Sequence, residues 1–312
     1  MANLFGNGEK IYQVEDNMNI MIIGIDIDGM PSFLFKKGFT ELGHNAFVVD
    51  VREVYSTLRN PIYDIEEYNR SKRLIPISHI IKALPPEKRD VDMVFCQQVW
   101  LHTINDLPRN IPVYYYHSEV QAPMTCLNPT HLGMGYSEAP NQLRRYYPRH
   151  YKSIQHKTFL WHGGDPSKYT PLKEGEEKIE GIHFFTNAKD RPEATREDSP
   201  YWSRNIYNFR DAVLQQYADE IIVHDWVELP EYQKLLPQFE TIAVIQGNGC
   251  YPSQRVFEAL YAGCRVKIFH ENVHSQTVFQ SLGPLTHEHF IKHHTYLQRA
   301  QQVLEEVKHV RN

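Results

Sequence analysis

The sequence predicts an α/β protein with two domains, each built on a parallel sheet covered by helices. Short apolar runs of strand length alternate with segments of helical periodicity along the 312 residues, which is typical of parallel sheets covered on both faces. The length also suits two domains of about 150 residues each better than one core.

The first half opens with a β-α-β pattern. Residues 19–26 form a short apolar run bounded by Gly and Asp, which predicts a buried parallel strand. A tight turn at Gly29 leads into an amphipathic helix that Gly43 ends. Further strands are expected at residues 46–51, 91–96 and 111–116.

The second half repeats this alternation. Expected strands are residues 181–186, 220–224, 241–245 and 265–269, and expected helices are residues 201–216, 229–236, 252–262 and 287–310. A Gly-rich stretch that ends in Pro166 separates the two halves. We therefore expect an N-terminal Rossmann-like domain at residues 1–158, a C-terminal Rossmann-like domain at 159–290 and a C-terminal helix at 291–312.

The composition is that of a globular protein for which no membrane span is expected. Apolar residues make up 41% of the chain and charged residues 23%, and no apolar run approaches about 18 residues. The first residues lack the features of a signal peptide. The four cysteines form no C-x-x-C pair, which favours reduced thiols and a cytoplasmic location. The net charge of −5 argues against a protein that coats nucleic acid.

The strongest functional signal lies between residues 242 and 269. An expected strand is followed by the loop Gly247-Asn248-Gly249 and then by a helix. The free N–H groups and the dipole of such a helix start attract phosphate. Arg255 can add a bidentate phosphate contact, and Glu258 can accept both hydroxyls of a ribose. A Gly-rich loop also serves tight packing alone, and a helical Arg and Glu are often solvated, so spacing leaves both interpretations open.

The segment at residues 251–264 resembles the donor-site segment of GT-B glycosyltransferases. It reads Tyr-Pro-Ser-Gln-Arg-Val-Phe-Glu-Ala-Leu-Tyr-Ala-Gly-Cys, and it is most similar to the CgeB-like, spore-maturation branch, with its Pro-Ser-x-Arg-x-Phe-Glu-Ala-x-Ala-x-Gly pattern. Weaker similarity extends to residues 227–237, residues 161–171 and the first β-α-β unit. The resemblance implies a GT-B fold, in which two Rossmann-like domains with parallel sheets face each other across a cleft.

The resemblance also implies residue roles. Glu258 matches the Glu that binds the donor ribose, and the backbone from Gly249 to Ser253 matches the pyrophosphate loop. His117 matches a His that contacts the donor sugar in many retaining members, although a lone His after a strand also serves structural roles. Many retaining members carry a second Glu eight residues before the ribose Glu, and Cys250 occupies that position here.

The Arg and Lys that usually bind the pyrophosphate in this family have no clearly aligned counterparts in this sequence. Asn187, Lys189 and Arg191 follow the first strand of the second half and are the natural candidates, although such charges are often simply solvated. The full set of expected donor-binding residues is Glu258, Arg255, Ser253, Gly249, Tyr251, Asn187, Lys189, Arg191 and Gly29.

Two short patterns could indicate a metal, but we expect none. The run Asp26-Ile27-Asp28 looks like an Asp-x-Asp motif, which belongs to a different transferase fold and recurs by chance. His289 and His293 share a helix face at a spacing that suits zinc, but without a completing carboxylate we favour a solvated helix face.

A basic, aromatic segment at residues 144–152 raises the acceptor question. Arg144, Arg145 and Arg149 alternate with tyrosines, which suits phosphate contact and base stacking, so an anionic acceptor such as DNA is one interpretation. An ordinary solvated helix near the hinge is the other, and we favour it.

The sequence thus predicts a glycosyltransferase that uses a nucleotide-diphosphate sugar, favouring a UDP-hexose, with retention and without metal or other cofactor. His117 would orient the sugar, and Asp28, after the first strand, is a candidate base. Amides and cations would stabilise the departing diphosphate. The alternatives are a phage-type transferase acting on modified DNA bases and, because of Cys250, a non-catalytic protein that binds nucleotide sugars.

Overall fold

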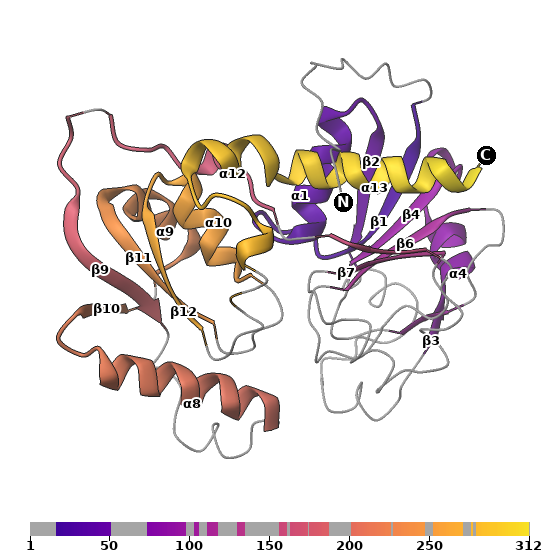
Figure 1. The fold of residues 1–312 in the computed structure, drawn as a ribbon. Coiled ribbons are helices and arrows are strands. Elements are labelled where there is room, and N and C mark those ends of the chain that lie inside the picture. Colours follow the sequence, from indigo (N-terminus) through magenta and orange to yellow (C-terminus); the bar gives the residue numbers. More distant parts are fainter. Residues whose placement is uncertain are drawn as a thin grey trace.

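The computed structural model has two lobes joined by a linker and by the C-terminal helices (Figure 1). It describes residues 17–50, 74–97, 103–105, 111–117, 130–134, 156–160, 163–173, 175–186, 201–225, 227–246, 252–270, 276 and 279–312 apart from the last residue. The described elements form a six-stranded and a four-stranded parallel sheet, together with a two-stranded pair. The two expected parallel sheets are therefore confirmed.

The N-terminal lobe is built on the six-stranded sheet, with strand order β2-β1-β4-β6-β7-β8. Its strands are β1 (Asn19–Gly24), β2 (Asn45–Asp50), β4 (Met93–Gln97), β6 (Val113–His117), β7 (His131–Met134) and β8 (His156–Phe159). All neighbours pair in parallel. The sequence predicted the first four of these strands and missed β7 and β8.

Helix α1 (Pro31–Glu41) covers one face of this sheet. Pro31 starts the helix, where its missing N–H costs nothing, and Gly43 follows its end with φ of +87°, a conformation that glycine adopts without strain. Phe35 and Phe39 are fully buried against Phe95 of β4. The predicted helix and its glycine stop are confirmed.

A small pair of strands stands beside the main sheet. Strands β3 (Leu74–Pro76) and β5 (Thr103–Asn105) pair in parallel, and α4 (Ile77–Ala83) and the 3-10 helix η1 (Pro86–Lys88) follow β3. The sequence did not predict this pair.

The C-terminal lobe is built on the four-stranded sheet, with strand order β10-β9-β11-β12. Its strands are β9 (Ile179–Thr186), β10 (Ile221–Asp225), β11 (Phe239–Gln246) and β12 (Arg265–His270). Its helices are α8 (Tyr201–Gln216), α9 (Leu229–Leu235) with η3 (Leu236–Gln238), and α10 (Gln254–Tyr261). Val213 of α8 packs on one face of the sheet, and a larger apolar cluster that includes α9 and α10 covers the other.

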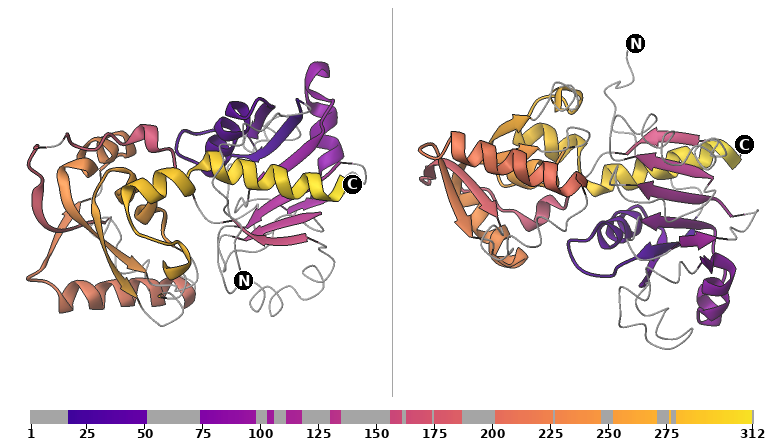
Figure 2. Two further views of the ribbon diagram at one scale, coloured as in Figure 1. Left: turned by 45° about the horizontal axis from the view of Figure 1, so that its top comes forward. Right: turned by 90° about the horizontal axis from the view of Figure 1, so that it is seen from below.

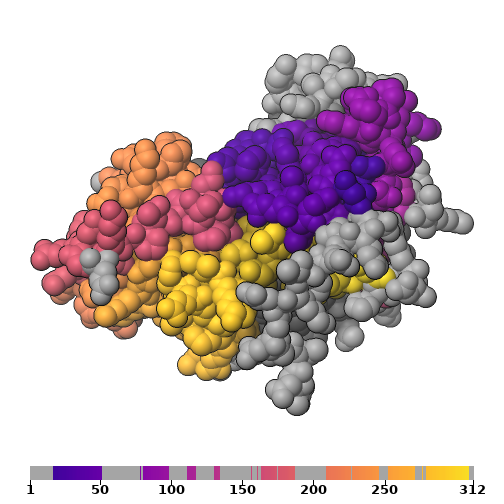
Figure 3. Space-filling model, turned by 90° about the horizontal axis from the view of Figure 1, so that it is seen from above, coloured from indigo at the N-terminus to yellow at the C-terminus, as the bar shows by residue number. Residues whose placement is uncertain are grey.

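The expected C-terminal helix is in fact two helices. Helix α12 (His287–His293) ends at the break His294–Thr295, and α13 (Tyr296–Arg311) then crosses to the N-terminal lobe. Figure 2 shows α13, in yellow, lying along that lobe, and Figure 3 shows yellow C-terminal residues meeting the indigo residues 17–50. Tyr296 packs edge-on against Phe35 with ring centroids 5.1 Å apart, so α13 completes the N-terminal core. The expected domain limits stay a prediction.

The C-terminal histidines are not a solvated helix face, so that interpretation was wrong. His287 donates to the Leu260 carbonyl at 2.8 Å, and His289 and His294 both lie 2.9 Å from the Leu282 carbonyl. His294 is buried, and burial lowers its pKa to about 3, so the neutral ring also accepts from Arg299. The hydrogen bonds of these rings stabilise the junction between α12 and α13.

None of the helices in the described part of the chain is both long and apolar enough to cross a membrane.

Candidate active site

Strand order in the C-terminal sheet creates a topological switch point between β9 and β11. The chain leaves β9 toward β10 on one side and later returns to β11 on the other. Ligands of open α/β sheets bind at such a topological switch point. Asn187, Lys189 and Arg191 follow β9, and Gly249 and Tyr251 follow β11, but all five lie outside the described residues.

Helix α10 follows β11, one of the two strands at this switch point. It begins at Gln254, two residues later than predicted, because Ser253 is its N-cap and its hydroxyl accepts from the Arg255 N–H at 3.4 Å. Pro252 therefore precedes the N-cap. The prediction that Pro252 is the first helical residue was wrong.

Arg255 ties α10 to the carboxyl end of β9. Its Nη1 donates to the Phe185 carbonyl at 2.6 Å, and its guanidinium carbon lies 5.4 Å from the centroid of the Phe184 ring. The side chain therefore lies at the carboxyl end of β9, beside the switch point. Its phosphate contact stays a prediction, since this conformation uses one guanidinium nitrogen to hold the main chain of β9.

Glu258 lies one helical turn later, and its side chain is almost completely buried. It is only 9% exposed, and the Tyr169 and Gln254 side chains hydrogen-bond to it. Burial raises the pKa of this carboxyl, and the charge of Arg255 and these hydrogen bonds oppose the shift. The structure thus holds one carboxylate in a fixed orientation within an apolar cluster, where hydrogen bonds to a ligand are strong.

Sequence reasoning missed two side chains of this region. The Thr186 hydroxyl, at the end of β9, is buried and has no hydrogen-bond partner among the described residues. Tyr169, from the linker, reaches Glu258. The weaker similarity at residues 161–171 includes this position, but only the tertiary packing shows what its hydroxyl contacts.

The N-terminal sheet has a second switch point, between β1 and β4. The loop after β1 closes tightly: the Ile25 N–H donates to the Ser32 hydroxyl at 3.0 Å, and the Ser32 N–H donates to Gln97 at the end of β4 at 2.8 Å. Gly29 has φ of +88°, and a Cβ added there would lie 2.7 Å from Leu229 at the start of α9. The loop after β1 therefore contacts the C-terminal lobe.

The two carboxylates of this loop do not converge. Asp26 pairs with Lys36 at 3.3 Å, and Asp28 pairs with Lys168 of the linker at 2.5 Å. Within the described ranges no group of three side chains suits a metal ion. Metal independence itself stays a prediction, as does the role of Asp28 as a base.

The other predicted site residues are described only in part. His117 ends β6, and its backbone lies at the carboxyl edge of the N-terminal sheet, level with Met134 of β7. Arg144, Arg145 and Arg149 lie outside the described residues, so the hypothesis of a DNA acceptor stays a prediction.

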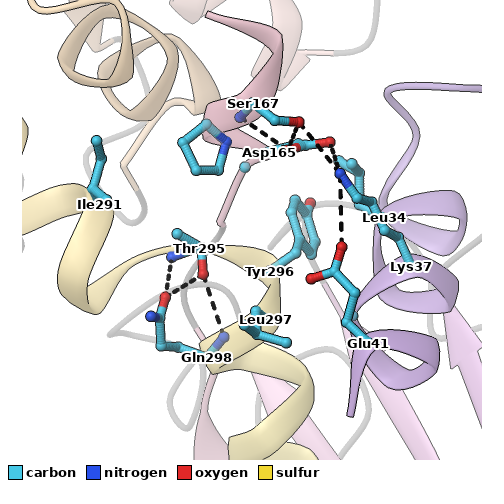
Figure 4. Close-up of a pocket in the computed structure, with 13 residues that line it drawn as sticks. Leu34, Lys37, Glu41, Asp165, Ser167, Ile291, Thr295, Tyr296, Leu297 and Gln298 are labelled. Atoms are coloured by element: carbon cyan, nitrogen blue, oxygen red, sulfur yellow. Dashed lines mark hydrogen bonds and ion pairs between the residues drawn. The ribbon is translucent and has the colours of Figure 1, made fainter. Parts of the chain in front are cut away.

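The linker between the lobes carries its own set of contacts. Asp165 caps the short helix η2 (Pro166–Lys168) and accepts from Lys37 of α1 at 2.5 Å. Its pKa is lowered because the hydrogen bonds from Lys37 and Ser167 outweigh burial. Figure 4 shows this contact at the edge of a pocket of about 280 Å³ between α1, the linker and the start of α13.

Comparisons with known proteins agree with this architecture. No protein-family model matches the chain, and no curated protein matches its sequence. Solved structures match over nearly the whole chain, and three of them are described next.

The first is a sucrose-phosphate synthase from Thermosynechococcus elongatus (TM-score 0.54, 10% identity, 93% of this chain and 98% of that one). The second is AviGT4, a glycosyltransferase involved in avilamycin A biosynthesis (TM-score 0.53, 13% identity, 93% of this chain and 97% of that one). The third is a glycosyltransferase from Rickettsia africae ESF-5 (TM-score 0.50, 13% identity, 95% of this chain and 99% of that one). At these identities the likeness shows the fold alone, and the expected GT-B fold is confirmed.

Proposed function

We propose that this chain is a glycosyltransferase that moves a sugar from a nucleotide-diphosphate sugar to an acceptor. The observation that carries the proposal is Glu258, a buried and hydrogen-bonded carboxylate one turn into the helix that follows a switch-point strand. A carboxylate fixed in this way can accept the two hydroxyls of a ribose without reorganising, which is what a nucleotide site requires. The resemblance of residues 251–264 to the donor segment of CgeB-like glycosyltransferases supports the same assignment.

In this proposal the donor is a UDP-sugar, and a hexose is its transferred group. The ribose binds Glu258, the diphosphate lies at the N-terminus of α10 and Arg255, and the sugar points toward Gly29 and His117 of the N-terminal lobe. The departing diphosphate is stabilised by N–H groups and cations, so transfer proceeds without a metal.

The anomeric bond to the diphosphate breaks while the acceptor oxygen forms the new bond, with retention. Asp28 is the candidate acceptor of the proton. The proposed location is the cytoplasm, which the buried thiols of Cys96 and Cys264, neither of them in a disulfide, support.

A binding screen followed by one substitution tests the proposal. Thermal unfolding is measured with UDP-, GDP-, ADP- and dTDP-glucose, because a ligand that binds only the folded state raises the melting temperature. Turnover of the stabilising donor is then compared in Glu258→Ala. Loss of two hydrogen bonds to a charged group predicts a fall in kcat/KM of about a hundredfold or more.

The matched control is Glu305→Ala, which removes an exposed carboxylate from α13. It should leave both donor binding and turnover unchanged. A shift in melting temperature without turnover on any acceptor would favour a binding protein instead, and unchanged turnover in Glu258→Ala would refute the ribose role.

A further inference from the structure

Lys168 is the one described cation of the linker that reaches the loop after β1. It is the last residue of η2, and its Nζ lies 2.5 Å from Oδ2 of Asp28. Both side chains are partly open to solvent, with 35% of the lysine and 53% of the aspartate side chain exposed. The pair spans from the linker to the N-terminal lobe at the level of its switch point.

The neighbours of this pair place it beside the proposed donor. Tyr169, the next residue along the chain, hydrogen-bonds to Glu258, which we assign to the ribose. Gly29, the residue after Asp28, packs on Leu229 at the start of α9. Lys168 therefore lies between the ribose carboxylate and the loop after β1, where a diphosphate attached to that ribose would extend toward the N-terminal lobe.

We propose that Lys168 is a donor-binding residue that exchanges Asp28 for the diphosphate of the nucleotide sugar. This inference rests on the proposed function. A single ion pair between solvent-exposed groups contributes little, so little is lost when it opens. A diphosphate offers several charged oxygens to the same ammonium group, and hydrogen bonds between charged partners are the stronger kind. The exchange is therefore favourable.

The linker backbone is held still while the lysine side chain moves. A Cβ added at Gly163 would lie 2.9 Å from the Thr295 backbone, and one at Gly164 would lie 2.4 Å from the Tyr261 ring, so the chain is packed tightly before η2. Tyr169 is buried directly after it. Only the aliphatic arm of Lys168 has to turn.

The exchange has a consequence for the order of binding. Once Lys168 turns to the diphosphate, the Asp28 carboxylate is no longer paired with it, and its oxygens can accept a hydrogen bond from the molecule that receives the sugar. The affinity for that molecule should therefore rise when the donor site is filled.

Three ligands separate this role from a structural one. Dissociation constants for UDP, UMP and uridine are measured by calorimetry with the full-length wild type and with Lys168→Ala and Lys168→Arg. We expect Lys168→Ala to weaken UDP by about tenfold or more, UMP much less and uridine not at all, because only the diphosphate extends toward the lysine. Lys168→Arg should recover most of the UDP affinity.

The matched control is Lys267→Ala. It breaks an ion pair of similar exposure with Glu220, 38% and 55%, in the C-terminal lobe, and should bind all three ligands as the wild type does. Equal UDP affinity in Lys168→Ala and wild type would overturn the inference while leaving the proposed function intact. An equal loss for uridine would overturn it as well, because it would indicate a structural role. A wild type that binds no nucleoside diphosphate would overturn both.

Discussion

The two switch points of this molecule have the same topology and opposite electrostatic designs. At the C-terminal one, a single carboxylate, Glu258, is buried in an apolar cluster and held by neutral hydrogen-bond donors. At the N-terminal one, Asp26 and Asp28 are exposed to solvent, and each pairs with a lysine. One site is fixed before any ligand arrives, and the other consists of ion pairs that open at little cost.

This difference indicates a division of labour within one fold. A buried carboxylate binds one partner geometry well and resists others, as a site for an invariant nucleotide should. Exposed, exchangeable ion pairs adapt to whichever ligand enters, as suits a face that meets the transferred sugar and the acceptor. The contact between Gly29 and Leu229 joins the loop after β1 to the start of α9, and so connects the two regions.

The largest expected effect comes from disturbing this contact. Gly29→Ala places a Cβ in a left-handed conformation and 2.7 Å from Cδ2 of Leu229, so backbone strain follows, and the end of the Leu229 side chain must shift. We expect a loss of about 2–3 kcal/mol in the free energy of unfolding, measured by urea denaturation, with a parallel loss of turnover.

Gly43→Ala is the matched control for this change. Gly43 has φ of +87° and nothing within 4 Å of an added Cβ, so it should show the backbone strain alone, about 1–2 kcal/mol. Combining Leu229→Ala with Gly29→Ala should recover the part of the stability loss by which Gly29→Ala exceeds Gly43→Ala. If the two glycine substitutions cost the same, the lobes do not rely on this contact.

A second prediction concerns stability against pH at Glu258. Its pKa is raised in the folded state, so the folded protein binds this proton more tightly than the unfolded chain does, and stability falls as pH rises through the interval between the two pKa values. Glu258→Gln should abolish that dependence and raise the free energy of unfolding above the interval by about 1 kcal/mol, although it impairs donor binding.

Asp28→Asn is the exposed counterpart, and its effect on stability should stay within about 0.5 kcal/mol across the same pH range. Denaturant titrations at several pH values provide the comparison. A Glu258→Gln protein that is less stable than wild type at neutral pH would mean that the carboxylate stabilises the fold, and the contrast between the two switch points would be lost.

The smallest expected effect is that of Tyr169→Phe. Its hydroxyl lowers the pKa of Glu258, so without it the carboxylate should protonate at higher pH, and the acid limb of kcat/KM should move upward. The donor KM should rise by about three- to tenfold with kcat nearly unchanged.

Tyr261→Phe removes a neighbouring buried hydroxyl that donates to the His294 carbonyl at 2.5 Å, and it should leave the pH profile in place. An acid limb that moves equally in both variants would argue that Tyr169 acts on packing alone.

Local patterns predicted the strands of the C-terminal sheet and four strands of the N-terminal sheet, but not β7 and β8. The residues 19–26 and 241–245 were found because they are short apolar runs, and the glycine stop of α1 was also found. The break at His294–Thr295 was missed because the helical periodicity runs through it. What ends α12 there is a tertiary network, in which His294 bonds to Leu282 and Arg299.

For the candidate site, the sequence located Glu258 and Arg255 on one helix through their spacing and through the family resemblance. It did not predict that Tyr169 contacts Glu258 or that Lys168 contacts Asp28, since these pairs join residues about 90 and 140 positions apart. Such contacts follow from how the linker crosses between the lobes, which no local pattern encodes.

The return of α13 to the N-terminal lobe has a consequence for how the protein is made. Ala300, Val303 and Val307 belong to the same core as Ile20 and Phe35, yet the ribosome adds them after the whole C-terminal sheet. The N-terminal lobe, which is synthesised first, therefore keeps an exposed apolar face until the C-terminal lobe has been synthesised. The N-terminal core is complete only when α13 packs on it, so the C-terminal lobe can finish folding before the N-terminal lobe does.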